Sequence, residues 1–265
     1  MTACAIDVHA HAFPDSLAER AISTLENECP WKAVARGKVD ELIASMDAAG
    51  IAASWICSIA TKSDQVEAIF KWSLAVRNER IVALPSVHPD TPDAEGWLAR
   101  FAEAGLPGIK LHPMYQRFAL DESRMDRIYA AARDCGLFVT AHCGLDIAFP
   151  DDDDRASPAR VAAVLDRFPG LCFIATHLGG WRSWDQAERY VIGRDAWLET
   201  SFALDALGAE RARRMIDRHG IERVMMGSDW PWQSQTKAVQ LVRELGFDEA
   251  STDKLLRANA ETFLG

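Results

Sequence analysis

Five side chains in this sequence have the types and the spacing of a metal site: His9, His11, His142, His177 and Asp229. Imidazole nitrogens and carboxylate oxygens are ligands that zinc and similar divalent cations prefer, and a site with four of them leaves a position for water or substrate. His9 and His11 are two residues apart in a strand-like segment, so both rings project from the same face. This set predicts a catalytic metal centre.

The elements that must position these residues recur along the whole chain. Short apolar segments predict eight buried strands, at residues 5–13, 51–60, 80–89, 108–113, 137–144, 171–180, 196–203 and 223–232. Amphipathic stretches with helical spacing lie between them, for example around residues 39–46, 66–70 and 161–168. Ser157 followed by Pro158 predicts a capped helix start, and Gly220 predicts the end of a helix at 211–218.

Alternating strands and helices favour parallel strands that are buried on both faces. Eight such units in 265 residues predict an α/β fold, a single (β/α)₈ TIM barrel domain over residues 1–265. A doubly wound open sheet is the competing architecture, but the GxGxxG turn after the first strand is missing. The connection from Phe13 to about Gly37 is longer than a usual loop and is expected to form a lid.

Composition and charge exclude several classes of partner. The formal net charge is −10, with 39 acidic against 29 basic side chains, so we expect no nucleic-acid partner. No apolar run approaches the length of about 20 residues that crosses a bilayer, and the N-terminus lacks the pattern of a signal peptide. The six cysteines form no CxxC pair. The sequence therefore predicts a cytoplasmic protein that acts on a small molecule and has no membrane contact.

Most of the chemically active side chains stand where predicted strands end. His11, His142, His177 and Asp229 each precede loop residues such as glycine or proline. In barrel enzymes the carboxyl end of the strands carries the chemistry. Asp7 precedes His9 by two residues on the same face, and we expect it to support the ligands or the fold rather than to bind the metal.

Several further residues are candidates for substrate contact. Lys110 and His112 share one face of a strand, so both are expected to contact substrate. Two other roles are open for Lys110: carboxylated, it would bridge two metals, and unmodified, it would instead pair with a buried acid as an ammonium ion. Trp181 and Trp230, with Trp184 and Trp232, flank the site residues and are expected to form either an apolar wall or ordinary packing.

The ordered motifs IDVHAHAF, GIKLHP, AHCG, SPARVAAVLDRFP, ATHLGG, MMGSDWPW and NAETFLG resemble the amidohydrolase superfamily. The resemblance is to its amidohydrolase-related group (amidohydrolase family 2), which includes aminocarboxymuconate-semialdehyde decarboxylase and related enzymes. It implies a divalent metal, most often Zn²⁺ with Mn²⁺ as the other choice, bound by the set His9, His11, His142 and Asp229. It also implies that His177 is an acid/base or a second-metal ligand, and relatives are commonly dimers, so a homodimer is open.

Three functions follow as hypotheses. The first is hydrolysis of a small amide, lactone or ester, in which the metal lowers the pKa of water toward roughly 7, Asp229 takes the proton and His177 assists the leaving group. The second is metal-dependent decarboxylation of an aromatic or unsaturated carboxylic acid. Several decarboxylases of the group begin with Glu-x-His where this chain has His9 and His11, but His-x-His occurs with both reactions. The third is a metal-binding barrel without catalysis.

Overall fold

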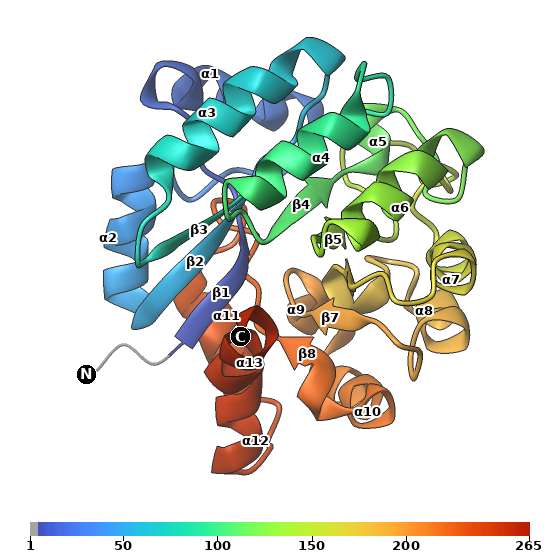
Figure 1. The fold of residues 1–265 in the computed structure, drawn as a ribbon. Coiled ribbons are helices and arrows are strands. Elements are labelled where there is room, and N and C mark those ends of the chain that lie inside the picture. The colour runs from blue at the N-terminus through green and yellow to red at the C-terminus, as the bar shows by residue number, and fades with distance from the viewer. Residues whose placement is uncertain (1–4) are drawn as a thin grey trace. The chain divides into compact units, whose positions relative to one another are not determined.

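The computed structural model of the protein describes residues 5–265 and is drawn in Figure 1. The described chain has eight strands, and each one lies inside one of the eight predicted segments. They are β1 (Ala5–Ala10), β2 (Ile51–Cys57), β3 (Ile81–Leu84), β4 (Gly108–Leu111), β5 (Phe138–Ala141), β6 (Phe173–Ala175), β7 (Trp197–Glu199) and β8 (Val224–Met225). The chain forms two compact units: unit 1 holds the residues through Ile56, Asn78–Val82 and Glu199–Gly265, and unit 2 holds Cys57–Arg77 and Ala83–Leu198.

In unit 1, strand β1 lies between two neighbours. It pairs in parallel with β2, with Asp7 opposite Ser54, and the backbone N–H of Val8 donates to the carbonyl of Met226 at 3.0 Å. These neighbours pair with both edges of β1, and the burial of all six of its residues shows that both of its faces are covered as well. This explains the apolar sequence around His9.

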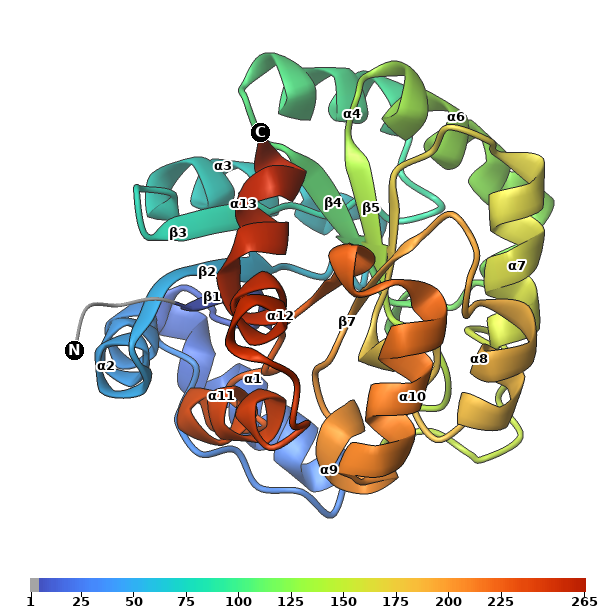
Figure 2. The same cartoon turned by 90° about the horizontal axis from the view of Figure 1, so that it is seen from below.

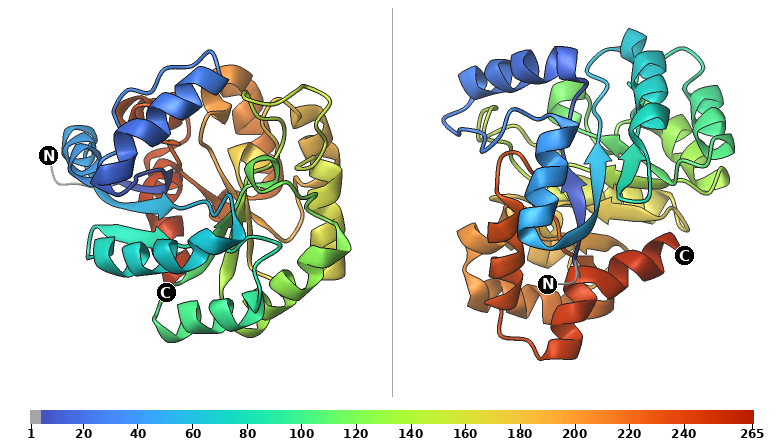
Figure 3. Two further views of the ribbon diagram at one scale, coloured as in Figure 1. Left: turned by 90° about the horizontal axis from the view of Figure 1, so that it is seen from above. Right: turned by 90° about the vertical axis from the view of Figure 1, so that its left-hand side faces the viewer.

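The helices of unit 1 cover these strands. Figure 3 shows α2 running alongside β1 and β2, and α2 also packs against α11. Two of the four apolar residues at helical spacing in residues 39–46 are buried, Leu42 and Met46. The helices are α1 (Asp15–Glu28), α2 (Val39–Ala49), α9 (Ala203–Leu207), α10 (Ala209–His219), α11 (Gln235–Arg243), α12 (Glu249–Asp253) and α13 (Asn259–Leu264).

Two features of unit 1 bear on the expectations from sequence. Helix α10 ends at Gly220, whose φ of 101° is in the region that favours glycine, so the predicted helix end is confirmed. The predicted long loop from Phe13 to Gly37 is wrong in part, because α1 occupies more than half of it. The apolar spacing of Ala18 and Ile22, both buried, holds that helix on the unit.

Unit 2 contains a parallel sheet with the order β4, β5, β6, β7. In its register Lys110 lies opposite Thr140, and Ala175 lies opposite Leu198. Figure 1 shows α4 and α6 beside β4 and β5, and Figure 2 shows α7 and α8 side by side. The helices are α3 (Val66–Val76), α4 (Ala94–Glu103), α5 (Pro113–Gln116), α6 (Asp126–Asp134), α7 (Pro158–Arg167) and α8 (Trp184–Tyr190).

The start of α7 only half follows its sequence pattern. The helix begins at Pro158 as predicted, because the fixed φ of proline suits the first helical position. The Ser157 hydroxyl, however, makes no capping hydrogen bond. The carbonyl of Ser157 instead accepts from the Arg160 N–H at 2.9 Å, so the predicted side-chain cap is wrong.

Strand ends carry the candidate residues in both units. In unit 1, His11 directly follows β1 and Asp229 follows β8 after a short loop. In unit 2, His142 follows β5 and His177 follows β6. Within the described residues 5–265, no helix is long and apolar enough to cross a membrane.

Candidate active site

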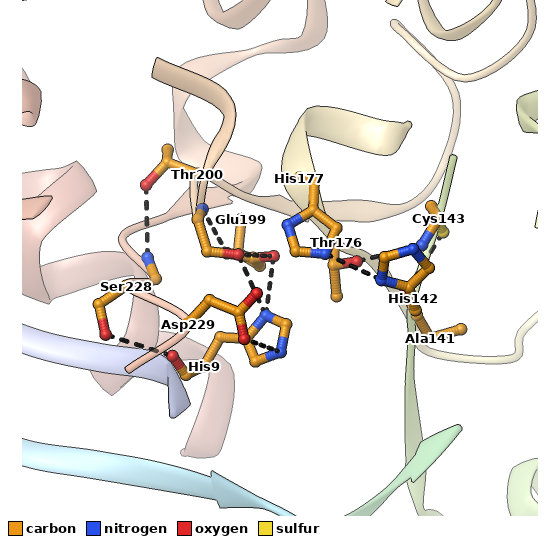
Figure 4. A network of polar contacts seen from close by, with 12 residues as sticks. His9, Ala141, His142, Cys143, Thr176, His177, Glu199, Thr200, Ser228 and Asp229 are labelled. Carbon is orange, nitrogen blue, oxygen red and sulfur yellow. Dashed lines mark hydrogen bonds and ion pairs between the residues drawn. The ribbon is translucent and has the colours of Figure 1, made fainter. Parts of the chain in front are cut away.

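Three of the predicted metal ligands meet in unit 1. The Nε2 atoms of His9 and His11 are 3.2 Å apart. The Asp229 carboxylate oxygen Oδ1 lies 3.0 Å from His11 Nε2 and 3.5 Å from His9 Nε2. Figure 4 shows Asp229 and His9 with their polar atoms turned toward one another. The loop after β8 is tied to β1, because the Asp229 N–H donates to the His9 carbonyl at 2.7 Å.

The geometry of this cluster fits a divalent cation. An ion held by two imidazole nitrogens at about 2.0–2.1 Å, with an angle of roughly 90–110° between the two bonds, sets those nitrogens about 2.8–3.4 Å apart. The observed separation of 3.2 Å lies in that range. Two nitrogens and one carboxylate oxygen also match the preference of zinc and manganese. The residues present therefore fit the metal that the sequence predicted.

A buried glutamate holds the His9 ring from its other side. Glu199, at the end of β7, places Oε1 3.1 Å from His9 Nδ1 and is fully buried. The Ser201 hydroxyl also lies 3.1 Å from this nitrogen. Sequence reasoning missed both residues. A carboxylate inside the apolar segment 196–203 was the available signal, because an unpaired buried charge is costly.

Asp7 organises the backbone behind the cluster. Its Oδ1 accepts from the N–H groups of His9 and Ser228, and its Oδ2 accepts from the Ser228 hydroxyl and from Gln235 Nε2. Burial raises the pKa of Asp7 to about 6, against these hydrogen bonds, which lower it. Asp7 thus supports the strand that carries His9, in line with the role expected from its position.

Unit 2 gathers a second set of histidines. His142 Nε2 lies 2.9 Å from the carbonyl of Leu145, and because a carbonyl only accepts, this nitrogen carries a proton. His142 Nδ1 lies 3.1 Å from His177 Nε2, and Figure 4 shows this contact. Burial, helped by His112 and His177, holds the pKa of His142 well below its usual range. His142 is therefore neutral, and its Nδ1 accepts a hydrogen bond from His177.

His112 belongs to the same cluster but is arranged differently. Its ring stacks on His142, with centroids 4.2 Å apart and planes only 14° from parallel. Asp146 Oδ2 lies 3.3 Å from His112 Nε2. Ring nitrogens bind metals in the ring plane, so two parallel rings do not aim their lone pairs at one ion. The group His112, His142 and Asp146 is thus better suited to holding a proton or an anion than to chelation, although its atoms are close.

The two candidate catalytic residues, His177 and Asp229, each have a backbone conformation that is strained. His177 has φ 57° and Asp229 has φ 61°, in the left-handed region that side chains rarely adopt. Such strain costs about 1 kcal/mol or more and persists where the surroundings fix it. At His177 the surroundings include Trp184, whose indole Nε1–H donates to the His177 carbonyl at 3.1 Å. Strain of this kind is common at functional sites.

The remaining predicted residues are all buried or partly so. Lys110 on β4 is fully buried, and His112 is 5% exposed. Trp230 is 1% exposed, with its backbone paired to Ala10 in unit 1, which favours packing over a wall for substrate. Trp181 in unit 2 donates from its backbone to the Cys143 carbonyl at 2.8 Å, next to His142. A substrate role for these residues stays a prediction.

A family model described as Amidohydrolase matches residues 6–265. The chain belongs to the amidohydrolase family. This amidohydrolase is also similar to solved structures over nearly its whole length. An uncharacterized TIM-barrel protein from Bordetella bronchiseptica is 16% identical, with a TM-score of 0.74 and 98% of each chain covered.

Two further similar structures are decarboxylases. One is 2,6-dihydroxybenzoate decarboxylase complexed with 2,6-dihydroxybenzoate, 16% identical with a TM-score of 0.72, covering 100% of this chain and 99% of that one. The other is 5-carboxyvanillate decarboxylase from Novosphingobium aromaticivorans complexed with manganese and 4-hydroxy-3-methoxy-5-nitrobenzoic acid, 16% identical with a TM-score of 0.72, covering 98% and 95%. At this identity the likeness shows the fold. The predicted (β/α)₈ barrel class is confirmed, and the protein is an enzyme of the amidohydrolase superfamily.

Proposed function

We propose that this amidohydrolase is a metal-dependent enzyme that releases carbon dioxide from a small aromatic or unsaturated carboxylic acid. The observation that carries the metal dependence is the convergence of His9, His11 and Asp229 in unit 1. The choice of decarboxylation is supported by the similar structures named as decarboxylases of aromatic acids. This reverses the order of the two leading hypotheses from sequence, which placed hydrolysis first.

His9, His11 and Asp229 would hold the metal. His142, the fourth ligand that the resemblance implies, would have to release the hydrogen bond that its Nδ1 accepts from His177 in order to bind the ion. The ion, when bound, supplies positive charge that holds an anionic substrate and stabilises charge that develops during the reaction. Zn²⁺ is the first choice from the ligand types, and Mn²⁺ is supported by the manganese complex of a similar decarboxylase. Asp229 balances the charge of the ion and, at 16% exposure, is the most accessible of the three ligands in unit 1.

In the proposed reaction the bond between the carboxyl carbon and the neighbouring carbon breaks, and the electron pair stays on that neighbouring carbon. This carbon must then take a proton. His177 is the proposed donor, because its Nε2 carries a proton that it shares with His142 Nδ1. Lys110 and His112 are the proposed contacts for the anionic groups of the substrate.

Hydrolysis remains the second candidate, and one observation favours it. The Asp229 carboxylate lies beside the nitrogens of His9 and His11, where it would accept the proton of an attacking water. The water oxygen would add to a carbonyl carbon of an amide, lactone or ester. The bond to the leaving group would then break, with His177 giving that group its proton.

Product analysis separates the two reactions. The metal-loaded protein is incubated with hydroxybenzoates and unsaturated dicarboxylic acids carrying a ¹³C-labelled carboxyl group, and in parallel with lactones, esters and amides. We expect labelled carbon dioxide and, in D₂O, deuterium on the carbon that lost it. Protein treated with a chelator is the control. Hydrolysis products without carbon dioxide, or turnover that survives metal removal, would overturn the proposal.

A further inference from the structure

We propose that Glu199 is the positioning residue of the metal centre: its carboxylate fixes the His9 imidazole with the proton on Nδ1, so that Nε2 presents its lone pair to the ion. This inference rests on the proposed function and names a residue that the ligand pattern does not contain.

The hydrogen bond itself sets the tautomer. Glu199 Oε1 is 3.1 Å from His9 Nδ1. An ionised carboxylate only accepts hydrogen bonds, so Nδ1 must be the donor. In a neutral imidazole the other nitrogen then has the lone pair. That nitrogen, Nε2, is the one that lies 3.2 Å from His11 Nε2 and 3.5 Å from Asp229 Oδ1.

Glu199 is itself held in place. The Ser201 N–H donates to Oε2 at 2.7 Å, and the Ser201 hydroxyl donates to Oε1 at 2.8 Å. The chain also passes so close to the carboxylate that a Cβ on Gly227 would lie 2.1 Å from Oε2. These hydrogen bonds hold the carboxylate against the His9 ring.

This arrangement has a general counterpart in metalloproteins. A metal-binding histidine commonly donates its second N–H to a carboxylate, which orients the ring and raises its basicity. Removal of such a partner typically weakens metal binding about 10–100-fold. Glu199 comes from a strand far from His9 in sequence, which is why the spacing of the ligands did not reveal it.

The test compares Zn²⁺ affinity, measured by competition with a chromophoric chelator, in the full chain and in three variants. We expect Glu199→Ala to bind Zn²⁺ about 10–100-fold more weakly. The Zn²⁺ affinity of Glu199→Gln should lie between those of Glu199→Ala and the native protein. The amide oxygen of glutamine still accepts a hydrogen bond from His9, but its NH₂ group cannot accept from the donors of Ser201. Thr200→Val is the matched control, since the Thr200 hydroxyl binds the neighbouring Gly227 N–H and not the His9 ring.

A second readout separates positioning from mere support of the fold. Two-bond ¹H–¹⁵N NMR spectra of the metal-free protein report which ring nitrogen carries the proton. We expect the Nδ1–H form of His9 in the native chain and in Thr200→Val, and its loss in Glu199→Ala. If Glu199→Ala does not fold, Glu199→Gln gives the same comparison with a smaller expected shift.

Two results are distinguishable failures. Native protein that binds no Zn²⁺ would overturn the proposed metal-dependent function. Native protein that binds Zn²⁺, together with folded Glu199 variants that match its affinity and keep the His9 Nδ1–H form, would overturn the role of Glu199 alone.

Discussion

The histidine clusters of the two units differ in which imidazole nitrogen is left with its lone pair. In unit 1 the carboxylate of Glu199 accepts a hydrogen bond from His9 Nδ1, which leaves Nε2 facing His11 and Asp229. In unit 2 the carbonyl of Leu145 takes up His142 Nε2 and leaves Nδ1 for a hydrogen bond. The ring nitrogen that bonds to the acceptor, Nδ1 of His9 or Nε2 of His142, decides which nitrogen keeps its lone pair.

Ring orientation completes the difference. The rings of His9 and His11 are 68° from parallel, so their in-plane lone pairs can converge. The rings of His112 and His142 are 14° from parallel and stack face to face. We infer that unit 1 is built to chelate, whereas the stacked His112–His142 pair of unit 2 is built to hold protons and anionic groups. The rings of His142 and His177 are 64° from parallel, so ring orientation does not distinguish that pair from His9 and His11. Substitutions that separate metal binding from turnover test this contrast.

The largest expected effect follows from His11→Ala. This change removes one of the two imidazole nitrogens that converge on the proposed ion, so bound metal should fall from about one per chain to below about 0.1. Turnover should fall by on the order of 10³-fold or more, which exceeds the 10–100-fold loss typical when a hydrogen-bond partner of a metal ligand is removed. Metal analysis after dialysis, together with the carbon dioxide assay, measures both. Full metal retention would contradict the assignment of chelation to unit 1.

His177→Asn should lower turnover about 10²–10⁴-fold, because the proposed proton donor is lost. The amount of bound metal should not change, because the substitution removes none of the proposed ligands in unit 1. Asparagine tolerates the left-handed backbone of this position, so the fold should persist. The same two measurements apply. Parallel loss of metal would show that His177 is a ligand, the alternative role that the family resemblance left open.

Two glycines give a matched pair for stability, one in each unit. Gly144→Ala should cost about 3 kcal/mol or more, because φ is +95° and the new Cβ would lie 2.1 Å from the Trp181 backbone nitrogen. Gly227→Ala should cost about 1–3 kcal/mol, because the close atom belongs to the Glu199 side chain. Urea unfolding measures both. Gly136→Ala, with φ +70° and open space, is the control at about 1 kcal/mol.

The smallest effect is expected from Asp146→Asn. Asp146 Oδ2 lies 3.3 Å from His112 Nε2, and both side chains are largely buried. Loss of the negative charge should therefore weaken the contact of His112 with substrate by about 1 kcal/mol, roughly fivefold, with the change in KM rather than in bound metal. Steady-state kinetics with the best carboxylic acid substrate provides the measurement. An equal fall in metal content would mean that unit 2 also chelates.

The strands, and the meeting of His9 and His11 with Asp229, could be predicted from the sequence. Each strand is a short apolar run, and His9 with His11 shows the alternation of a strand within three residues. The position of Asp229 at a strand end, together with the resemblance to the amidohydrolase family, completed the set. The apolar runs and the alternation depend on residues that are close together in the sequence, so a single sequence is enough to detect them.

Other parts of the site depend on contacts that spacing does not encode. Glu199 reaches His9 across 190 positions, and its only local sign was a carboxylate within an apolar strand. Asp146 lies in an acidic loop, where nothing marked it as the partner of His112. The Ser157 cap failed for a related reason, since a hydroxyl of the right type does not fix the rotamer that would make the bond.

The left-handed backbone at His177 and Asp229 narrows what these positions can become. Besides glycine, asparagine, aspartate and histidine adopt such angles most readily, and β-branched residues do so least. Laboratory evolution of a new reaction on this scaffold is therefore expected to recruit those residue types at both positions. Libraries that omit valine, isoleucine and threonine there would lose few folded members.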